Sequence, residues 1–142
     1  MKDAIVFLKD LVNDTELGSK GTHFGLITFN KNARLEFNFG DASYYKKNAV
    51  FKKLDDVRSV HSRKETKEQD DSKSSQPQLA LEKADQLFTV QEGDRPEKPN
   101  VLIVLTDAQV IPSLRDAVKK SEFNRFVKSV AANLKVSDSA VR

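Results

Sequence analysis

The residues best suited to chemistry in this chain are Thr106 and Asp107, a hydroxyl and a carboxylate that directly follow the aliphatic run 101–105. A run without polar alternation is typical of a strand covered on both faces, and therefore of a parallel strand inside an α/β sheet. Pro96 and Pro99 exclude a helix leading into it. In open α/β sheets, ligands bind just past the carboxyl ends of the strands. Asp107 is therefore a candidate site residue, the alternative being that it only caps a turn or a following helix.

Catalytic constellations are hard to find elsewhere. The sequence contains neither Gly-x-Gly-x-x-Gly nor a Walker pattern, so a phosphate-cradling loop is not indicated. The histidines are His23 and His61, with no serine or cysteine nucleophile motif near either, and we expect both to be plain surface residues. Thr106 and Asp107 could take part in acid–base chemistry only together with a second carboxylate. No Asp or Glu stands at a sequence spacing that would place it beside them. We expect the protein not to be an enzyme.

Composition indicates one soluble domain of modest hydrophobicity. The 142 residues are 38% hydrophobic and 32% charged, with 24 basic and 21 acidic side chains. Because no basic face is interleaved with aromatic residues, nucleic acid is not an expected partner. No run approaches the roughly 18 apolar residues of a membrane span. We expect Met1 to lead into an amphipathic helix rather than a signal peptide. With no cysteine, the chain has no disulfide, thiol nucleophile or zinc–thiolate site.

Hydrophobic spacing predicts a helix and then a hairpin in the N-terminal part. Residues 2–14 show helical periodicity, residues 22–29 are dense enough for a mostly buried strand, and residues 30–32 suit a tight turn. Residues 34–39 alternate apolar and polar and predict a half-exposed edge strand. The expected inward side chains are Ala4, Ile5, Phe7, Leu8, Leu11 and Val12 in the helix and Leu35, Phe37 and Phe39 in the edge strand, with Arg34, Glu36 and Asn38 outward.

The remaining elements are expected to alternate helix and strand. We predict helices over about 44–58 and 78–88, and two more over about 110–120 and 122–134. Residues 61–75 contain almost nothing apolar, so we expect a mobile surface loop. The inward side chains are predicted to be Tyr45, Val50, Phe51, Leu54 and Val57 in the second helix and Leu79, Ala80, Ala84, Leu87 and Phe88 in the third. Strands alternating with helices indicate a sheet between helical layers.

Two segments resemble parts of the von Willebrand factor A domain. GTHFGLITFNKNARLEFNFG is similar to that family's second and third strands, and LALEKADQLFTVQEGDRPEKPNVLIVLTDAQ to its following helix, linker and fourth strand. The resemblance covers roughly residues 1–109 and is strongest to A domains of animal matrix and adhesion proteins. It implies a three-layer α/β/α Rossmann-like sandwich with a mostly parallel sheet and one antiparallel edge hairpin.

The resemblance also implies a divalent-cation site, usually for magnesium. The family's ligands are an Asp-x-Ser-x-Ser loop after the first strand, a Thr before the third helix and the Asp of Thr-Asp-Gly. Asp107 matches the last ligand, Ser75 falls where the Thr stands, and Ala108 replaces the Gly. No Asp-x-Ser-x-Ser occurs in the chain, and the strand that carries it would precede Met1. Two oxygen ligands are too few for magnesium, which needs near-octahedral geometry, so we expect no tight metal in this chain.

The resemblance is incomplete at both ends. A missing first strand would leave the strands at 22–29 and 100–106 with unpaired edges, which can recruit another chain, so we expect a fragment or joined ordered segments. The family's C-terminal strands are not seen either. We assign residues 1–120 to an incomplete A-like domain. Residues 121–142 are either the first helix of a second A-like repeat, since FVKSVAANLKVSDSAVR resembles FLKDLVNDTELGSKGTH, or a coincidental amphipathic helix.

Two functions follow from the resemblance. The first is a non-enzymatic protein-binding or adhesion module of a secreted extracellular matrix protein, with collagen or an adhesion ligand as partner. It is either metal-dependent through the partial site of Ser75 and Asp107 or independent of metal. The alternative is a metal-independent structural spacer in a fibrous or mineral-associated matrix, which suits the mixed charge and the polar stretch 61–75.

Overall fold

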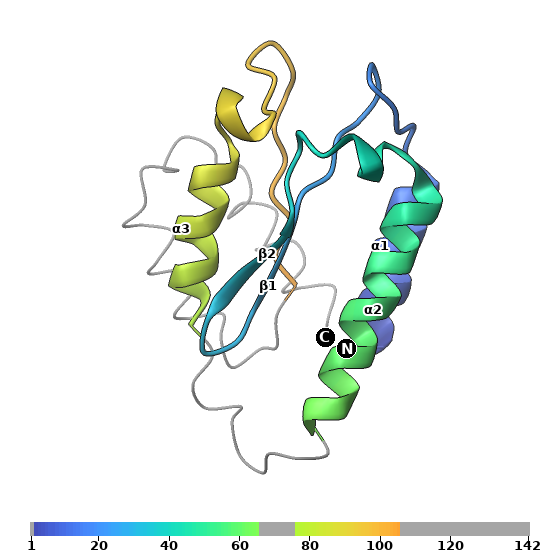
Figure 1. Ribbon diagram of the computed structural model, residues 1–142, viewed down its shortest axis with the longest axis vertical. Coiled ribbons are helices and arrows are strands. Elements are labelled where there is room, and N and C mark those ends of the chain that lie inside the picture. Colours follow the sequence, from blue (N-terminus) through green and yellow to red (C-terminus); the bar gives the residue numbers. More distant parts are fainter. Residues whose placement is uncertain (1, 66–75, 106–142) are drawn as a thin grey trace, which may run out of the picture.

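A computed structural model describes residues 2–65 and 76–105, apart from the side chains of residues 2 and 61–65. Figure 1 shows α3 on one side of the hairpin β1–β2 and the pair α1 and α2 on the other. The described elements in chain order are α1 (Lys2–Asn13), β1 (Leu26–Phe29), β2 (Ala33–Phe37), the 3₁₀ turn η1 (Ala42–Tyr45), α2 (Lys47–Glu65), α3 (Pro77–Leu87) and the 3₁₀ turn η3 (Val90–Glu92).

The core lies between α1, α2 and the hairpin. Ile5 and Val12 are seven residues apart, two helical turns, and therefore face the same way from α1. Val50 and Leu54 face them from α2, and Phe37 from β2; these five residues form one buried cluster. Lys9 of α1 makes an ion pair of 2.6 Å with Asp55 of α2 at the edge of this interface. The predicted helix 2–14 is confirmed, although Phe7, expected inside, is 49% exposed.

The hairpin contains a β-bulge. Leu26 pairs with Phe37, but the next residue, Ile27, pairs with Leu35, so Glu36 is the extra residue of β2. A bulge breaks the strict in–out alternation of a strand. Phe37 is buried and stacks on Tyr44 with ring centroids 3.9 Å apart.

This bulge inverts part of the predicted alternation. Leu35, expected inside, is 37% exposed, whereas the Glu36 side chain, expected outside, is 7% exposed. The first strand also differs from the prediction, because β1 begins only at Leu26 and its residues are half-buried rather than mostly buried. The tight turn over residues 30–32 is confirmed.

The two later helices differ from their predictions mainly at the ends. Tyr45 lies in η1, and α2 begins at Lys47 and continues to Glu65. The predicted loop 61–75 is therefore wrong for residues 61–65; they contain neither glycine nor proline, so nothing ends the helix there. Residues 66–75 lie outside the described residues, as do the helices predicted at 110–120 and 122–134 and the whole segment 121–142.

α3 confirms the helix predicted at 78–88. Its buried residues are Pro77, Leu81, Ala84 and Leu87. A methyl group added to Gly25, just before β1, would lie 3.5 Å from Leu87 Cδ1, which shows how closely α3 covers the second face of the hairpin. Leu79, Ala80 and Phe88, also expected inside, are half-buried.

The aliphatic run differs most from its prediction. Residues 101–105 form no strand, and their exposure alternates, with Val101 71%, Ile103 46% and Leu105 39% exposed. The expected burial on both faces is therefore wrong for the described part of this run. The physical reason is that neighbouring strands cover the edges of a central strand and helical layers cover its two faces, so the run needs both to be buried. In the described residues the one sheet is the antiparallel pair β1–β2, so a mostly parallel sheet is not observed there.

The segment that follows β2 is hydrogen-bonded to η3. The Gly40 N–H donates to the carbonyl oxygen of Glu92 at 3.0 Å, and the Asn38 side-chain amide donates to the Glu92 carboxylate at 2.6 Å. The next residue, Gly93, has φ of +92°. A β-carbon on Gly93 would lie 2.3 Å from the Gly40 nitrogen, which is too close for any side chain.

Gly93→Ala is therefore expected to lower the free energy of unfolding by more than about 2 kcal/mol, because positive φ and a backbone clash act together. Gly18→Ala is the matched control: its φ is +140°, but nothing lies within 4 Å of an added β-carbon. Gly18→Ala should lower the free energy of unfolding by only about 1 kcal/mol. Urea unfolding followed by circular dichroism measures both, and equal losses would show that the Gly93–Gly40 contact is not close.

Candidate functional site

The predicted site residues lie just outside the described part of the chain. Ser75 immediately precedes Gln76, and Thr106, Asp107 and Ala108 follow Leu105. The structure therefore describes the backbone that leads into both predicted ligands, but not the ligands themselves. The side chain of His61 is also outside the described residues.

The approach to Ser75 is tied to the hairpin turn. The Gln76 N–H donates to the carbonyl oxygen of Asn30 at 2.8 Å, and the Asn30 N–H donates across the turn to Asn32 O at 3.0 Å. Pro77, the first residue of α3, is fully buried and fixes its entry. We call this end of the fold, made by residues 30–32 and 76–77, the rim.

The approach to Asp107 runs toward the same end of the molecule. In the view of Figure 1 the orange segment that ends at Leu105 descends toward the end of the molecule where the hairpin turn and the start of α3 lie. The described chain thus directs the entries to both predicted site residues to one end of the fold. Asn30, Lys31 and Asn32 are exposed there.

The metal prediction concerns Ser75 and Asp107, which lie outside the described residues. No group of three or more His, Cys, Asp or Glu side chains that could hold a metal occurs among the described residues. Ser75 and Asp107 would supply two oxygen donors, and magnesium requires near-octahedral coordination by hard oxygen ligands. The absence of a tightly held magnesium ion in this chain therefore stays a prediction.

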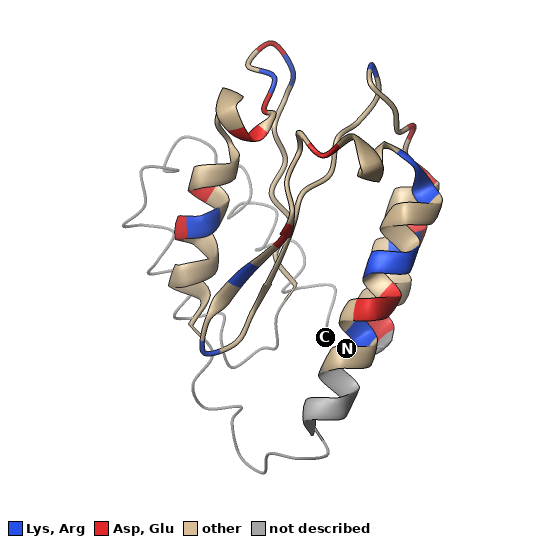
Figure 2. Ribbon diagram, viewed as in Figure 1, with Lys and Arg blue, Asp and Glu red and all other residues tan. Residues whose placement is uncertain are grey.

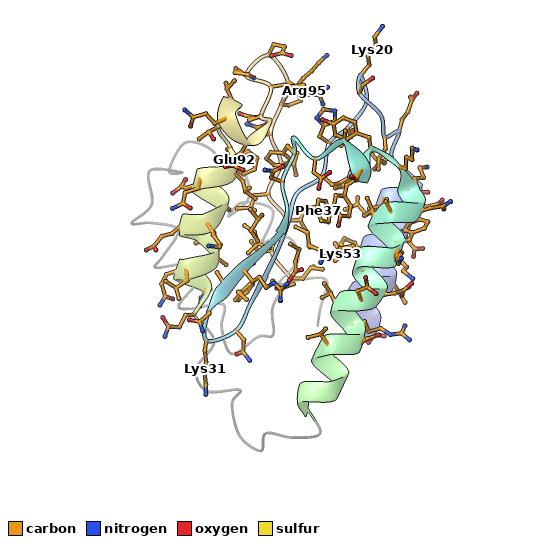
Figure 3. All side chains as sticks on the ribbon, viewed as in Figure 1. Lys20, Lys31, Phe37, Lys53, Glu92 and Arg95 are labelled. Atoms are coloured by element: carbon orange, nitrogen blue, oxygen red, sulfur yellow. The ribbon has the colours of Figure 1, made fainter. Side chains whose placement is uncertain are left out.

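A partly buried ionic cluster joins the hairpin to α2. The Glu36 carboxylate accepts a hydrogen bond from Thr28 Oγ1 at 2.9 Å and forms an ion pair of 2.8 Å with Lys53 Nζ. Arg34 Nε lies 3.5 Å from the same carboxylate. Figure 3 shows Lys53 and Phe37 between α2 and the hairpin. Each oxygen of the Glu36 carboxylate thus has a donor within the protein. The cluster therefore connects the hairpin to α2 and is not an open binding site.

The charges around Glu36 decide its protonation. Burial by itself raises the pKa of this carboxyl, but the hydrogen bonds from Lys53 and Thr28 and the positive charges of Lys53 and Arg34 outweigh it, so the pKa is lowered. The alternation of residues 34–39 predicts Glu36 on the exposed side of its strand; this prediction is wrong, and nothing in that alternation indicates the cluster. The available signal was Lys53, which lies at helical spacing between Val50 and Val57, on the inward face of α2.

His23 also has a structural role, at the other end of the hairpin. Its ring is half-buried and stacks on Tyr45 with centroids 4.0 Å apart, and its Nε2 lies 3.1 Å from the carbonyl oxygen of Gly18. Its Nδ1 is buried without a hydrogen-bond partner. The tautomer with hydrogen on Nε2 donates to Gly18 and leaves Nδ1 as an unused acceptor. The predicted plain surface residue is therefore wrong for His23.

Charge is mixed over the described surface. Figure 2 shows basic and acidic residues interspersed along α2 and α3 rather than gathered on one face. No helix in the described part of the chain is both long and apolar enough to span a membrane.

Comparison with known proteins gives one finding. Residues 1–141 match the family model described as the von Willebrand factor type A domain. A search of curated proteins and a search of solved structures each found no match. The match covers nearly the whole chain, including the rim residues 30–32 and 76–77.

Proposed function

Because the chain belongs to the von Willebrand factor type A domain family, we propose that it is a non-enzymatic protein-binding module of a secreted extracellular matrix protein and holds its partner at the rim. Domains of this family generally mediate protein–protein interaction and commonly occur in extracellular proteins. The family match over residues 1–141 is the observation that carries the proposal.

The rim supports the placement of the binding surface. The hydrogen bond from Gln76 to Asn30 holds the residue after Ser75 against an exposed turn. In Figure 1 the segment ending at Leu105 runs toward the same end, and we infer that Asp107, two residues later in the sequence, lies there. We therefore assign direct partner contacts to Ser75 and Asp107, a hydroxyl that donates or accepts and a carboxylate that accepts hydrogen bonds.

The proposed partner is a protein of the extracellular matrix, for which triple-helical collagen is a suitable probe. A hydrogen bond to an ionised carboxylate contributes more than a neutral one, because the negative charge attracts the donor hydrogen more strongly. Asp107 is therefore the residue whose loss should weaken binding most. Magnesium dependence belongs in the same test, since Ser75 and Asp107 are the two positions that match ligands of the family.

The test compares Asp107→Ala with a matched acidic-to-alanine control, Asp56→Ala, on the exposed face of α2. Binding of the full chain to immobilised triple-helical collagen is measured by surface plasmon resonance, once in magnesium chloride and once in EDTA. We expect Asp107→Ala to weaken binding at least tenfold, about 1.4 kcal/mol, and Asp56→Ala to leave it unchanged. Because two donors do not make a magnesium centre, the wild-type affinity should be the same in both solutions.

Other results would change the proposal in defined ways. If wild-type chain does not bind collagen, or if Asp107→Ala binds as well as wild type, adhesion to collagen through Asp107 is excluded and a structural spacer becomes the better proposal. If EDTA abolishes binding, the contact is metal-dependent and further ligands must complete the site.

A further inference from the structure

One surface asparagine has the sequence context of an attachment site for sugar. Asn13, Asp14 and Thr15 form an Asn-x-Thr triplet in which x is not proline, the pattern that N-glycosylation requires. No other asparagine in the chain has a serine or threonine two residues later. The triplet begins at the last residue of α1, where the helix ends.

The structure leaves the side-chain amide of Asn13 available. Asn13 is exposed, and its backbone carbonyl, not its side chain, accepts a hydrogen bond from Lys47 Nζ. Its side-chain amide has no hydrogen-bond partner among the described residues. A substituent on Nδ2 would therefore break no contact of the described fold.

Thr15 indicates when such a modification takes place. In the folded chain its hydroxyl is part-buried and donates to the carbonyl oxygen of Leu11 at 2.7 Å. A transferase that reads this hydroxyl must reach it before α1 and its C-terminal turn have formed. Attachment therefore precedes folding, and the exposure of Asn13 allows the folded domain to keep the sugar.

We propose that Asn13 carries an N-linked oligosaccharide at the end of the fold opposite the rim, an inference that rests on the secreted location in the proposed function. The donor class is an oligosaccharide linked through its anomeric carbon to a lipid pyrophosphate. Asn13 Nδ2 forms a bond to that carbon as the bond from carbon to pyrophosphate oxygen breaks. The lipid pyrophosphate leaves with the electron pair, and the amide proton passes to a base of the transferase.

The position of the sugar is compatible with binding at the rim. In Figure 1, α1 starts near the mark N, at the end of the molecule where the hairpin turn lies, and runs away from it. Asn13 is the last residue of this helix. A sugar on the exposed Asn13 would therefore extend into solvent at the end of the molecule opposite the rim. It would leave residues 30–32 and 76–77 uncovered.

The test translates the full chain, with a secretion signal added in front, in the presence of animal microsomes. Only protein protected from added protease is analysed, because that fraction has entered the lumen. Wild type is expected to carry one glycan, removed by peptide-N-glycosidase with conversion of residue 13 to aspartate. Asn13→Gln and Thr15→Ala should carry none, whereas Thr15→Ser should keep the glycan because serine supplies the same hydroxyl.

A control variant shows that the lumen is competent to modify this chain. Asn32→Ser places a serine two residues after Asn30 in the exposed hairpin turn and should raise the count to two glycans. Protease-protected wild type without a glycan would overturn the proposal, as would a glycan that survives Asn13→Gln. Such a failure leaves the proposed function standing, because the collagen test is made on unglycosylated protein without the added signal.

Discussion

Leu54→Ala is expected to lower the free energy of unfolding by about 2–5 kcal/mol, the cost of removing a buried leucine and leaving a cavity. Leu54 is 2% exposed and lies in the cluster where α1, α2 and β2 meet. Small domains are stable by only about 5–15 kcal/mol, so this single change removes a large part of the stability. Urea unfolding followed by far-ultraviolet circular dichroism measures the loss.

Val60→Ala is the control on the same helix. Val60 is 47% exposed, so its truncation should change the free energy of unfolding by less than about 1 kcal/mol. Comparing the two losses in the free energy of unfolding tests which face of α2 is buried. If Val60→Ala costs as much as Leu54→Ala, the helix presents a different face to the hairpin.

Lys53→Met is expected to lower the free energy of unfolding by about 2–3 kcal/mol, because it leaves the largely buried Glu36 carboxylate without its nearer cation and with only the exposed Arg34 beside it. The Glu36 side chain is 7% exposed and that of Lys53 22%, so water screens the pair only partly. Lys52→Met is the matched control on the neighbouring exposed position of α2 and should change stability by less than about 0.5 kcal/mol. Comparable losses in both variants would contradict the ion pair.

The same pair predicts how stability depends on pH. The pKa of Glu36 is lowered in the folded state from an ordinary value of 4.5, so below that value the unfolded chain takes up a proton more readily than the folded one. The stabilisation is therefore present above about pH 4.5 and is lost as the pH falls through the folded pKa. Lys53→Met should flatten this part of the stability curve. An unchanged acid dependence would show that other carboxyl groups determine it.

Sequence periodicity and turn chemistry were sufficient for the elements whose pattern is local. The spacing of Ile5 and Val12 predicted α1, the polar residues 30–32 predicted the hairpin turn, and the spacing of Ala84 and Leu87 predicted α3. Such elements follow from the sequence because side chains three, four or seven residues apart share a helix face whatever surrounds them. The family could also be named from the sequence, from the order of these elements and from the run that ends in Thr106 and Asp107.

The tertiary structure decided what depends on neighbours distant in the chain. The bulge at Glu36 turned a carboxylate expected in water toward Lys53 of α2, because the strand register follows its partner and not its own alternation. The run 101–105 is aliphatic enough for a buried strand, yet Val101 and Ile103 are exposed. Burial on both faces needs strands on either side and helices above and below, and no residue supplies these by itself. Thus hydrophobicity determines which segment is suited to the centre of a sheet, and only the neighbouring elements determine whether it is covered.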